Sequence, residues 1–168
     1  MKRAAAVFFA VFCLIFCLPS CTATKNDSPP SCREILAAMI ESEVGLPAGK
    51  IYCDTAEYGS DEYLAASTVA SIVGNGKLPQ ICESWLDCAF FLALKDHPCE
   101  FAVVHCKSRD AALDTAKLLS TRLASSKLLK GNSDYFENAK VTVIGNYALL
   151  IVSSDPTATL RAAKKVIN

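Results

Sequence analysis

The amino-acid sequence predicts an α+β fold, a two-layer sandwich in which helices cover an antiparallel sheet built from two ββα units. Two observations carry this prediction. Two pairs of strand-like segments are each joined by a short turn, and each pair is followed by a segment with helical periodicity. One or two further helices are expected before the first pair. The chain has 168 residues, and residues 31–168 are predicted to form one domain of this kind.

Two helices are predicted ahead of the first strand pair. Ser31 and Glu34 have the spacing of a capping box, which satisfies backbone N–H groups at a helix start. Behind them, apolar residues recur at three- and four-residue steps as far as Val44. A second helix is expected over residues 60–73, before a Gly-Asn-Gly segment that ends it. Between the two helices, residues 50–58 fit either a short strand or a loop.

The first ββα unit is predicted in the middle of the chain. Residues 86–94 are largely apolar on both faces, as expected of a strand buried within a sheet. Residues 99–107 form the second strand of the hairpin. Residues 108–129 then have apolar positions along one helical face, and Gly131 follows as the residue that terminates the helix.

The second ββα unit closes the chain. Residues 139–144 and 147–153 are separated by Gly-Asn, a dipeptide that two-residue hairpin turns prefer. Such a turn places Ile144 beside Tyr147. Asp155 then caps a final helix, with a proline at the first helical position. In this register one face of the hairpin is apolar and holds Val141, Val143, Ala148, Leu150 and Val152.

The composition restricts the class of protein. The 17 basic and 17 acidic residues give a formal net charge of zero, which argues against a nucleic-acid-binding protein. Hydrophobic residues make up 52% of the chain, but they are most concentrated in residues 4–18. The composition excludes collagen-like, coiled-coil, multi-span membrane and disordered proteins.

The N-terminus has the layout of a secretory signal. Lys2 and Arg3 precede fifteen consecutive apolar residues, residues 4–18. As a helix, this run would measure about 22 Å, which is shorter than the roughly 30 Å hydrocarbon core of a bilayer. A short apolar run behind a basic leader is typical of a signal peptide. We therefore expect residues 1–20 to be a signal peptide.

The end of the apolar run resembles the lipobox of bacterial lipoproteins. Leu18 is the aliphatic residue, Ser20 the small residue, and Cys21 the cysteine that would receive diacylglycerol and a palmitate-type acyl chain. Pro19 departs from the usual choice at its position. The resemblance implies that Cys21 anchors the chain and that residues 21–30 form a polar tether. The alternatives are an ordinary cleaved signal and an uncleaved anchor.

Several segments of the predicted domain carry a second resemblance to a known family. They are residues 35–47, Tyr58 with Gly59, residues 100–112, Arg122, and residues 145–156. Together they resemble a family of uncharacterised lipoproteins of Gram-positive gut-type bacteria, built on a domain of unknown function. The resemblance implies a lipid-anchored extracytoplasmic domain and carries no catalytic residues. The many cysteines of this chain depart from that family's pattern.

Six of the nine cysteines lie in the predicted domain, and an even number in an exported protein suggests disulfides. A register with Leu94 opposite Glu100 would pair the first two strands. In that register Cys88 and Cys106 lie opposite each other, close enough to form a disulfide. The alternative is that the cysteines are small buried hydrophobic residues, or that they are never oxidised. No cysteine pair has the spacing typical of zinc ligands, so no metal site is predicted.

No constellation of catalytic residues is evident. His105 and Cys106 are neighbours, but adjacent residues on a strand point to opposite faces. His97 and Cys99 avoid that objection, yet no third residue orients the histidine. The sequence also lacks the hydrolase elbow, phosphate-binding and metalloprotease motifs. We therefore predict that the chain is not an enzyme.

The candidate binding surface is aromatic. Exposed tyrosines and other aromatic residues are favoured at recognition sites. The candidates are Tyr58 and Tyr63, together with Tyr135 and Phe136 in the predicted loop over residues 131–138. The alternative is that these side chains are buried between the sheet and the helices, as is expected of Trp85.

These observations predict a lipid-anchored protein at the extracytoplasmic face of the cell membrane, with a non-catalytic binding or structural domain. Its expected partners are the membrane, through the N-terminal lipid, the lipoprotein-processing enzymes, and an envelope protein or small ligand. Neither a cofactor nor nucleic acid is expected. The alternatives are an extracytoplasmic thiol-dependent enzyme and a thiol–disulfide handling protein, although the latter usually carries a Cys-x-x-Cys motif that is missing here.

Overall fold

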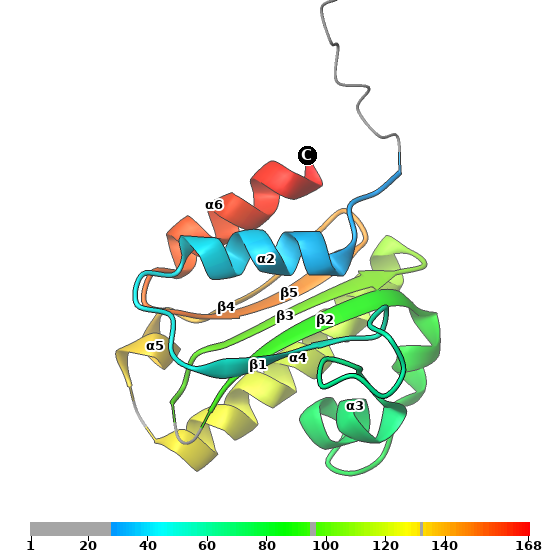
Figure 1. The fold of residues 1–168 in the computed structure, drawn as a ribbon, viewed down its shortest axis with the longest axis horizontal. Coiled ribbons are helices and arrows are strands. Elements are labelled where there is room, and N and C mark those ends of the chain that lie inside the picture. The colour runs from blue at the N-terminus through cyan, green and yellow to red at the C-terminus, as the bar shows by residue number, and fades with distance from the viewer. Residues whose placement is uncertain (1–27, 95–96, 132) are drawn as a thin grey trace, which may run out of the picture.

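A five-stranded antiparallel sheet with helices around it forms the centre of the protein (Figure 1). The computed structural model describes residues 28–94, 97–131 and 133–168. The expectations for the signal peptide, for lipidation of Cys21 and for most of the tether lie outside the described residues. In chain order the elements are α2 (Cys32–Ser42), β1 (Gly49–Cys53), α3 (Ala66–Val73), η1 (Gln80–Ser84), β2 (Trp85–Ala93), β3 (Glu100–Cys106), α4 (Arg109–Lys130), α5 (Asp134–Glu137), β4 (Lys140–Ile144), β5 (Tyr147–Val152) and α6 (Pro156–Ile167).

The strand order is β1-β2-β3-β5-β4, and every neighbouring pair is antiparallel. The predicted hairpins are therefore β2–β3 and β4–β5, and they join through β3 and β5. The α+β prediction and its two ββα units are confirmed. Within the described parts of the chain, no helix is both long and apolar enough to cross a bilayer.

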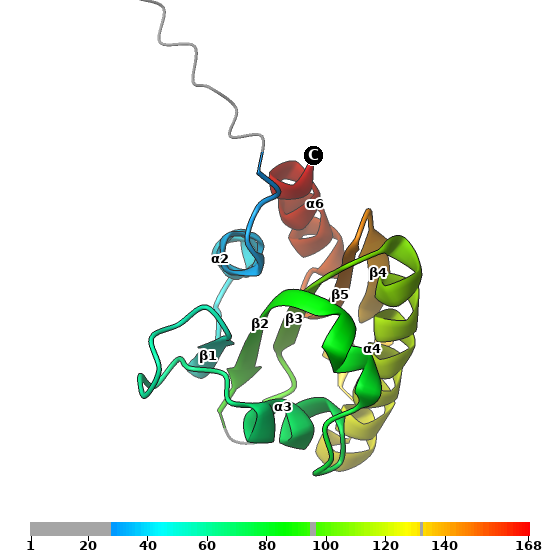
Figure 2. The same ribbon diagram turned by 90° about the vertical axis from the view of Figure 1, so that its right-hand side faces the viewer.

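Helices cover both faces of the sheet, so the domain has three layers and not the expected two. Helices α2 and α6 pack side by side on one face, whereas α3 and α4 lie on the other (Figure 2). The central strands explain this arrangement. β5 is buried along its whole length, and β3 is buried everywhere except at His105. Strands that are apolar on both faces need a helical layer on each side.

The β4–β5 hairpin has the predicted register. Ile144 pairs with Tyr147, and Val141 pairs with Leu150. The five residues predicted for its apolar face all belong to the core beneath α3 and α4. Gly145 has a φ of +56°, a conformation that favours glycine and explains why this turn requires it.

The β2–β3 hairpin differs from the prediction by two residues. Leu92, and not Leu94, lies opposite Glu100. Cys88 therefore pairs with Val104, and the register on which the Cys88–Cys106 disulfide was based is wrong. Both thiols are free in the structure. β2 ends at Ala93, where the backbone N–H donates to the carbonyl of Cys99 at 3.2 Å, and this bond goes with the observed register.

Three of the predicted helices begin at capping side chains. Ser31 and Glu34 form the complete capping box in front of α2. Ser108 Oγ accepts a hydrogen bond from the N–H of Ala111 at the start of α4. Asp155 accepts two backbone N–H groups at the start of α6. These local signals were readable because a cap and its partner lie within three residues of each other.

The second helix begins later than predicted, at Ala66. The preceding segment returns to the end of β1, where the N–H of Cys53 donates to the carbonyl of Glu62 and the N–H of Leu64 donates to the carbonyl of Cys53. These long-range bonds hold the backbone in an extended form and prevent an earlier helix start. Residues 50–58, which fitted either a strand or a loop, contain most of the short strand β1.

One buried ion pair joins the sheet to α4. Glu100 is 1% exposed and Arg122 is 19% exposed. Arg122 Nε donates to Glu100 Oε1 at 2.9 Å, and Nη2 donates to Oε2 at 3.1 Å. Ser126 Oγ also donates to Oε2, at 3.2 Å. Two side chains of α4 therefore bind the Glu100 carboxylate at the start of β3.

Candidate functional site

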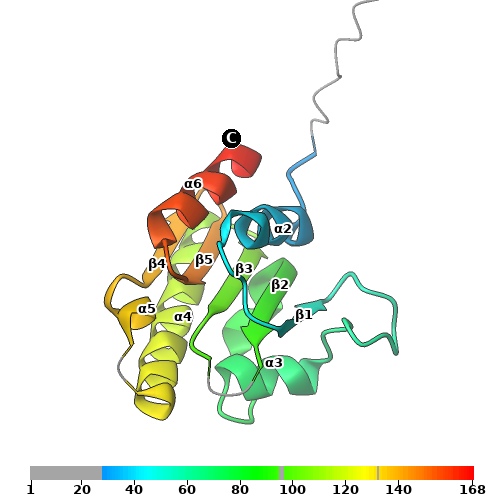
Figure 3. The ribbon, with the colours of Figure 1, turned by 60° about the vertical axis from the view of Figure 1, so that its left-hand side comes forward.

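The four aromatic residues selected from the sequence do not form one surface. Tyr58 and Tyr63 lie in the loop after β1 and contact edge to face, with ring centroids 5.2 Å apart. Tyr135 and Phe136 belong to α5, on the opposite side of the domain (Figure 3). Tyr58 is 86% exposed, but Phe136 is 6% exposed and belongs to the core beneath α3 and α4. Phe136 is therefore a core residue and is removed from the candidate surface.

The neighbouring His105 and Cys106 point to opposite faces of the sheet, as predicted for adjacent strand residues. The ring of His105 stacks on that of Tyr147 with centroids 4.4 Å apart. Cys106 Sγ lies 3.4 Å from Thr115 Oγ1, on the α4 side. Trp85 Nε1 also donates to Thr115 Oγ1, at 3.0 Å. The histidine and the thiol are therefore separated by the sheet.

Four of the cysteines have the environment of inert thiols. Burial raises the pKa of Cys99 to about 12 and that of Cys82 to about 11, and it also raises the pKa values of Cys32 and Cys88. The Nδ1 atom of His97 accepts a hydrogen bond from the Cys99 backbone N–H at 3.2 Å, so this nitrogen is bonded to the backbone and not to the thiol. The thiolate is the nucleophile in cysteine chemistry, so these thiols are poorly suited to it.

Three polar residues that are distant in the sequence meet at one end of the β1–β2 pair. Cys53 ends β1, Asp54 follows it, and Asp87 lies near the start of β2. One ligand atom from each, a sulfur and two carboxylate oxygens, all lie within 4.8 Å of one another. We refer to Cys53, Asp54 and Asp87 as the carboxylate–thiol cluster. Among the described residues, this group alone brings three such ligand atoms together.

Strand pairing and helix α2 position the two carboxylates. The N–H of Cys88 donates to Asp54 Oδ2 at 3.2 Å, and the N–H of Asp54 donates to the carbonyl of Cys88 at 3.3 Å. A register irregularity in β2 immediately precedes Asp87. The N–H of Cys32, the first residue of α2, donates to Asp87 Oδ2 at 2.5 Å. The positive end of the helix dipole therefore points at the Asp87 carboxylate.

The cluster concentrates negative charge, and His105 is paired opposite Asp87 across β2 and β3. Burial raises the pKa of Asp54 to about 6, and contact with the Asp87 carboxylate raises it as well. The described residues form three ion pairs, and none of them includes Asp54 or Asp87. Asp87 Oδ1 is buried and has no hydrogen-bond partner. Such a site favours either a proton or a bound cation.

The sequence contained one signal for this cluster. Asp87 is an acidic residue in a strand whose same-face neighbours are Ala89 and Phe91, where a carboxylate needs a partner. Cys53 and Asp54 carried no comparable signal, because the segment that contains them fitted a strand or a loop equally well. Only the pairing of β1 with β2 brings the three residues together.

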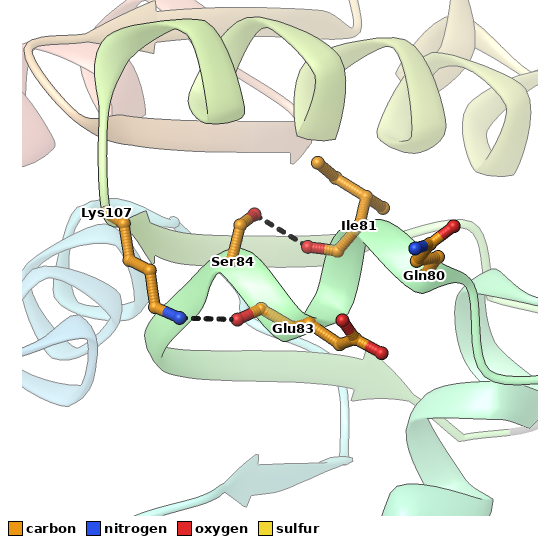
Figure 4. A pocket seen from close by; sticks show the side chains of 5 residues that line it. All are labelled: Gln80, Ile81, Glu83, Ser84 and Lys107. Carbon is orange, nitrogen blue, oxygen red and sulfur yellow. Dashed lines mark hydrogen bonds between the residues drawn. The ribbon is translucent and has the colours of Figure 1, made fainter.

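A pocket of about 410 Å³ lies beside η1 and is lined by Gln80, Ile81, Glu83, Ser84 and Lys107 (Figure 4). Two of its polar side chains are already bonded to backbone carbonyls of the pocket wall. Lys107 Nζ donates to the Glu83 carbonyl at 2.9 Å, and Ser84 Oγ donates to the Ile81 carbonyl at 2.6 Å. The carboxylate–thiol cluster, which brings three ligand atoms together, is the stronger candidate site.

No protein-family model, curated protein or solved structure matches this chain. The resemblance to the lipoprotein family stays a prediction.

Proposed function

We propose that the chain is an extracytoplasmic lipoprotein, held at the cell membrane by a lipid on Cys21, whose domain binds an envelope protein or a small ligand and does not catalyse a reaction. The observation that carries the location is the lipobox-like Leu18, Ser20 and Cys21 behind a basic leader and an apolar run. Two or three acyl chains at Cys21 would hold the protein at the membrane nearly permanently, because each buried methylene contributes about 0.8 kcal/mol.

The way in which the chain enters the domain supports a short tether. Tyr147 Oη donates to the carbonyl of Pro30 at 2.7 Å, so the end of the tether is bound to the first residue of β5. The chain between Cys21 and Pro30 can span no more than about 30 Å. With a lipid on Cys21, the domain would stay close to the bilayer, where envelope components are its nearest partners.

Two features favour binding over thiol chemistry. The raised pKa values of Cys82 and Cys99 oppose both the thiol-dependent enzyme and the thiol–disulfide handling protein, since each requires a reactive thiolate. The exposed Tyr58 packs edge to face on the half-buried Tyr63, and this pair supplies an aromatic contact of the kind that recognition surfaces favour. They are half of the surface predicted from the sequence, and Tyr135 lies too far away to contribute.

The anchor can be tested by labelling. The full-length chain, expressed in a Gram-positive host fed with an alkyne-tagged palmitate, should become labelled, partition into detergent and begin at modified Cys21. Cys21→Ala should lose the label and accumulate as precursor or appear in the medium. Mature membrane protein that still begins at Met1 would contradict the anchor.

The binding role can be tested with the acylated protein. Cross-linking in solubilised membranes should capture a partner that is lost in Tyr58→Ala and kept in Tyr135→Ala, the matched aromatic control. A hydrolytic or redox turnover that disappears with one cysteine, histidine or carboxylate replacement, in a protein that is still folded, would show that the domain is an enzyme.

A further inference from the structure

The carboxylate–thiol cluster has the donor set of a transition-metal site. Cys53 supplies a sulfur, and Asp54 and Asp87 each supply a carboxylate oxygen, all within 4.8 Å of one another. In a tetrahedral zinc site, bond lengths of 2.0–2.3 Å place the ligand atoms roughly 3.5 Å apart. The three side chains would need to close by only about 1 Å to reach that geometry.

One oxygen in the cluster already lacks a partner. Asp87 Oδ2 accepts the N–H of Cys32, but Oδ1 is buried and accepts no hydrogen bond. A buried carboxylate oxygen without a donor is unfavourable by a few kcal/mol in general. A cation bound to Oδ1 would replace the missing donor and leave the bond from Cys32 in place.

The surroundings of the ligands resemble the outer shell of a metal site. Backbone N–H groups of Cys32 and Cys88 hold one oxygen of Asp87 and one of Asp54. Thr55 Oγ1 lies 3.3 Å from Cys53 Sγ. Hydrogen bonds of this kind orient ligands and raise metal affinity.

The donor types select the class of metal. Ca²⁺ takes six to eight oxygen ligands, and Mg²⁺ requires octahedral oxygen coordination, so a sulfur with two carboxylates suits neither. A thiolate with two carboxylates suits a zinc-class ion, with water as the fourth ligand.

We propose that Cys53, Asp54 and Asp87 bind one zinc-class divalent ion. On binding, the Cys53 thiol gives its proton to solvent and its sulfur coordinates the metal as thiolate. The site belongs to the domain alone and does not depend on lipidation or on the aromatic contact at Tyr58.

Cobalt titration of the full-length, reduced and metal-free protein tests the site. Co²⁺ should bind with a stoichiometry of one and produce a thiolate-to-cobalt charge-transfer band with strong visible bands of tetrahedral Co²⁺, and Zn²⁺ should displace it. Cys53→Ser should lose the charge-transfer band. Asp87→Asn and Asp54→Asn should each weaken binding by at least about 10-fold.

Cys82→Ser is the matched thiol control, because Cys82 is partly buried and lies outside the cluster. It should bind Co²⁺ with an unchanged spectrum and affinity. Where circular dichroism shows that Cys53→Ser does not fold, Asp54→Asn decides, because its amide retains the size of the carboxylate. No cobalt spectrum at millimolar Co²⁺, or affinity that is unchanged in the folded cluster variants, would overturn the proposal.

Discussion

Loss of the Arg122 guanidinium should destabilise the fold, because the buried Glu100 carboxylate then loses its ion-pair partner. Arg122→Met leaves the Glu100 carboxylate, which is 1% exposed, with only the hydroxyl of Ser126 as a side-chain donor. Removing one partner of a buried ion pair costs about 3–5 kcal/mol. The total free energy of unfolding of a domain is about 5–15 kcal/mol, so this single change would remove about a fifth of it or more.

Urea denaturation followed by circular dichroism gives the free energy of unfolding of each variant. The matched control is Lys117→Met on the same helix. Its ion pair with Asp114 is exposed, with the two side chains 79% and 57% accessible, so its loss should cost less than about 1 kcal/mol. Adding Glu100→Leu to Arg122→Met should recover most of the lost stability, because a hydrophobic pair often replaces a buried ion pair at little cost.

The comparison of Arg122→Met with Lys117→Met tests whether the buried ion pair stabilises the fold. If Arg122→Met is no more destabilising than Lys117→Met, Glu100 is solvated in solution and the buried pair does not hold β3 to α4. If the double variant is as unstable as Arg122→Met alone, the loss comes from the packing of the arginine stem and not from the unpaired carboxylate.

Three further predictions concern single side chains. Cys82, whose pKa is raised to about 11, should have roughly 100-fold less thiolate at pH 8 than an unperturbed thiol, so its alkylation rate, followed by peptide mass mapping, should rise about tenfold per pH unit and level off only near its pKa. An alkylation rate that levels off near pH 9 would contradict the burial. Phe136→Ala should cost about 3–5 kcal/mol in urea denaturation because it empties a core position, whereas Tyr58→Ala should be nearly neutral. Ser31→Ala should cost about 1 kcal/mol through loss of the capping box, and an unchanged unfolding midpoint would show that α2 does not need its cap.

The sequence predicted those elements whose signals are local. The cap at Ser31, the cap at Asp155 and the turn at Gly145 each act within a few residues, and all three are as expected. The register of β2–β3 was wrong because the loop after β2 has no dipeptide that selects one turn type. The predicted start of α3 was too early, because backbone hydrogen bonds to Cys53 hold the preceding segment in an extended form.

The candidate site could not be predicted for the same reason. Its three residues lie in or beside two strands, and the segment that forms β1 fitted a loop as well as a strand. The cysteine spacing typical of zinc sites arises when two ligands share one turn, whereas Asp54 and Asp87 approach each other across a strand pair. Of the aromatic residues, Tyr58 was correctly expected at the surface, whereas the chain pattern could not show that Phe136 packs under α4.

The position of β1 and β4 at the two edges of the sheet has a consequence for crowding. An edge strand offers unpaired backbone groups to a second copy of the chain, and lipid-anchored molecules would meet one another at high local concentration. Both edge strands are only five residues long, and each carries a lysine, Lys50 in β1 and Lys140 in β4. Short edges that carry positive charge resist strand-to-strand polymerisation, so copies of the chain would remain separate molecules even at the local concentration that the proposed anchor would produce.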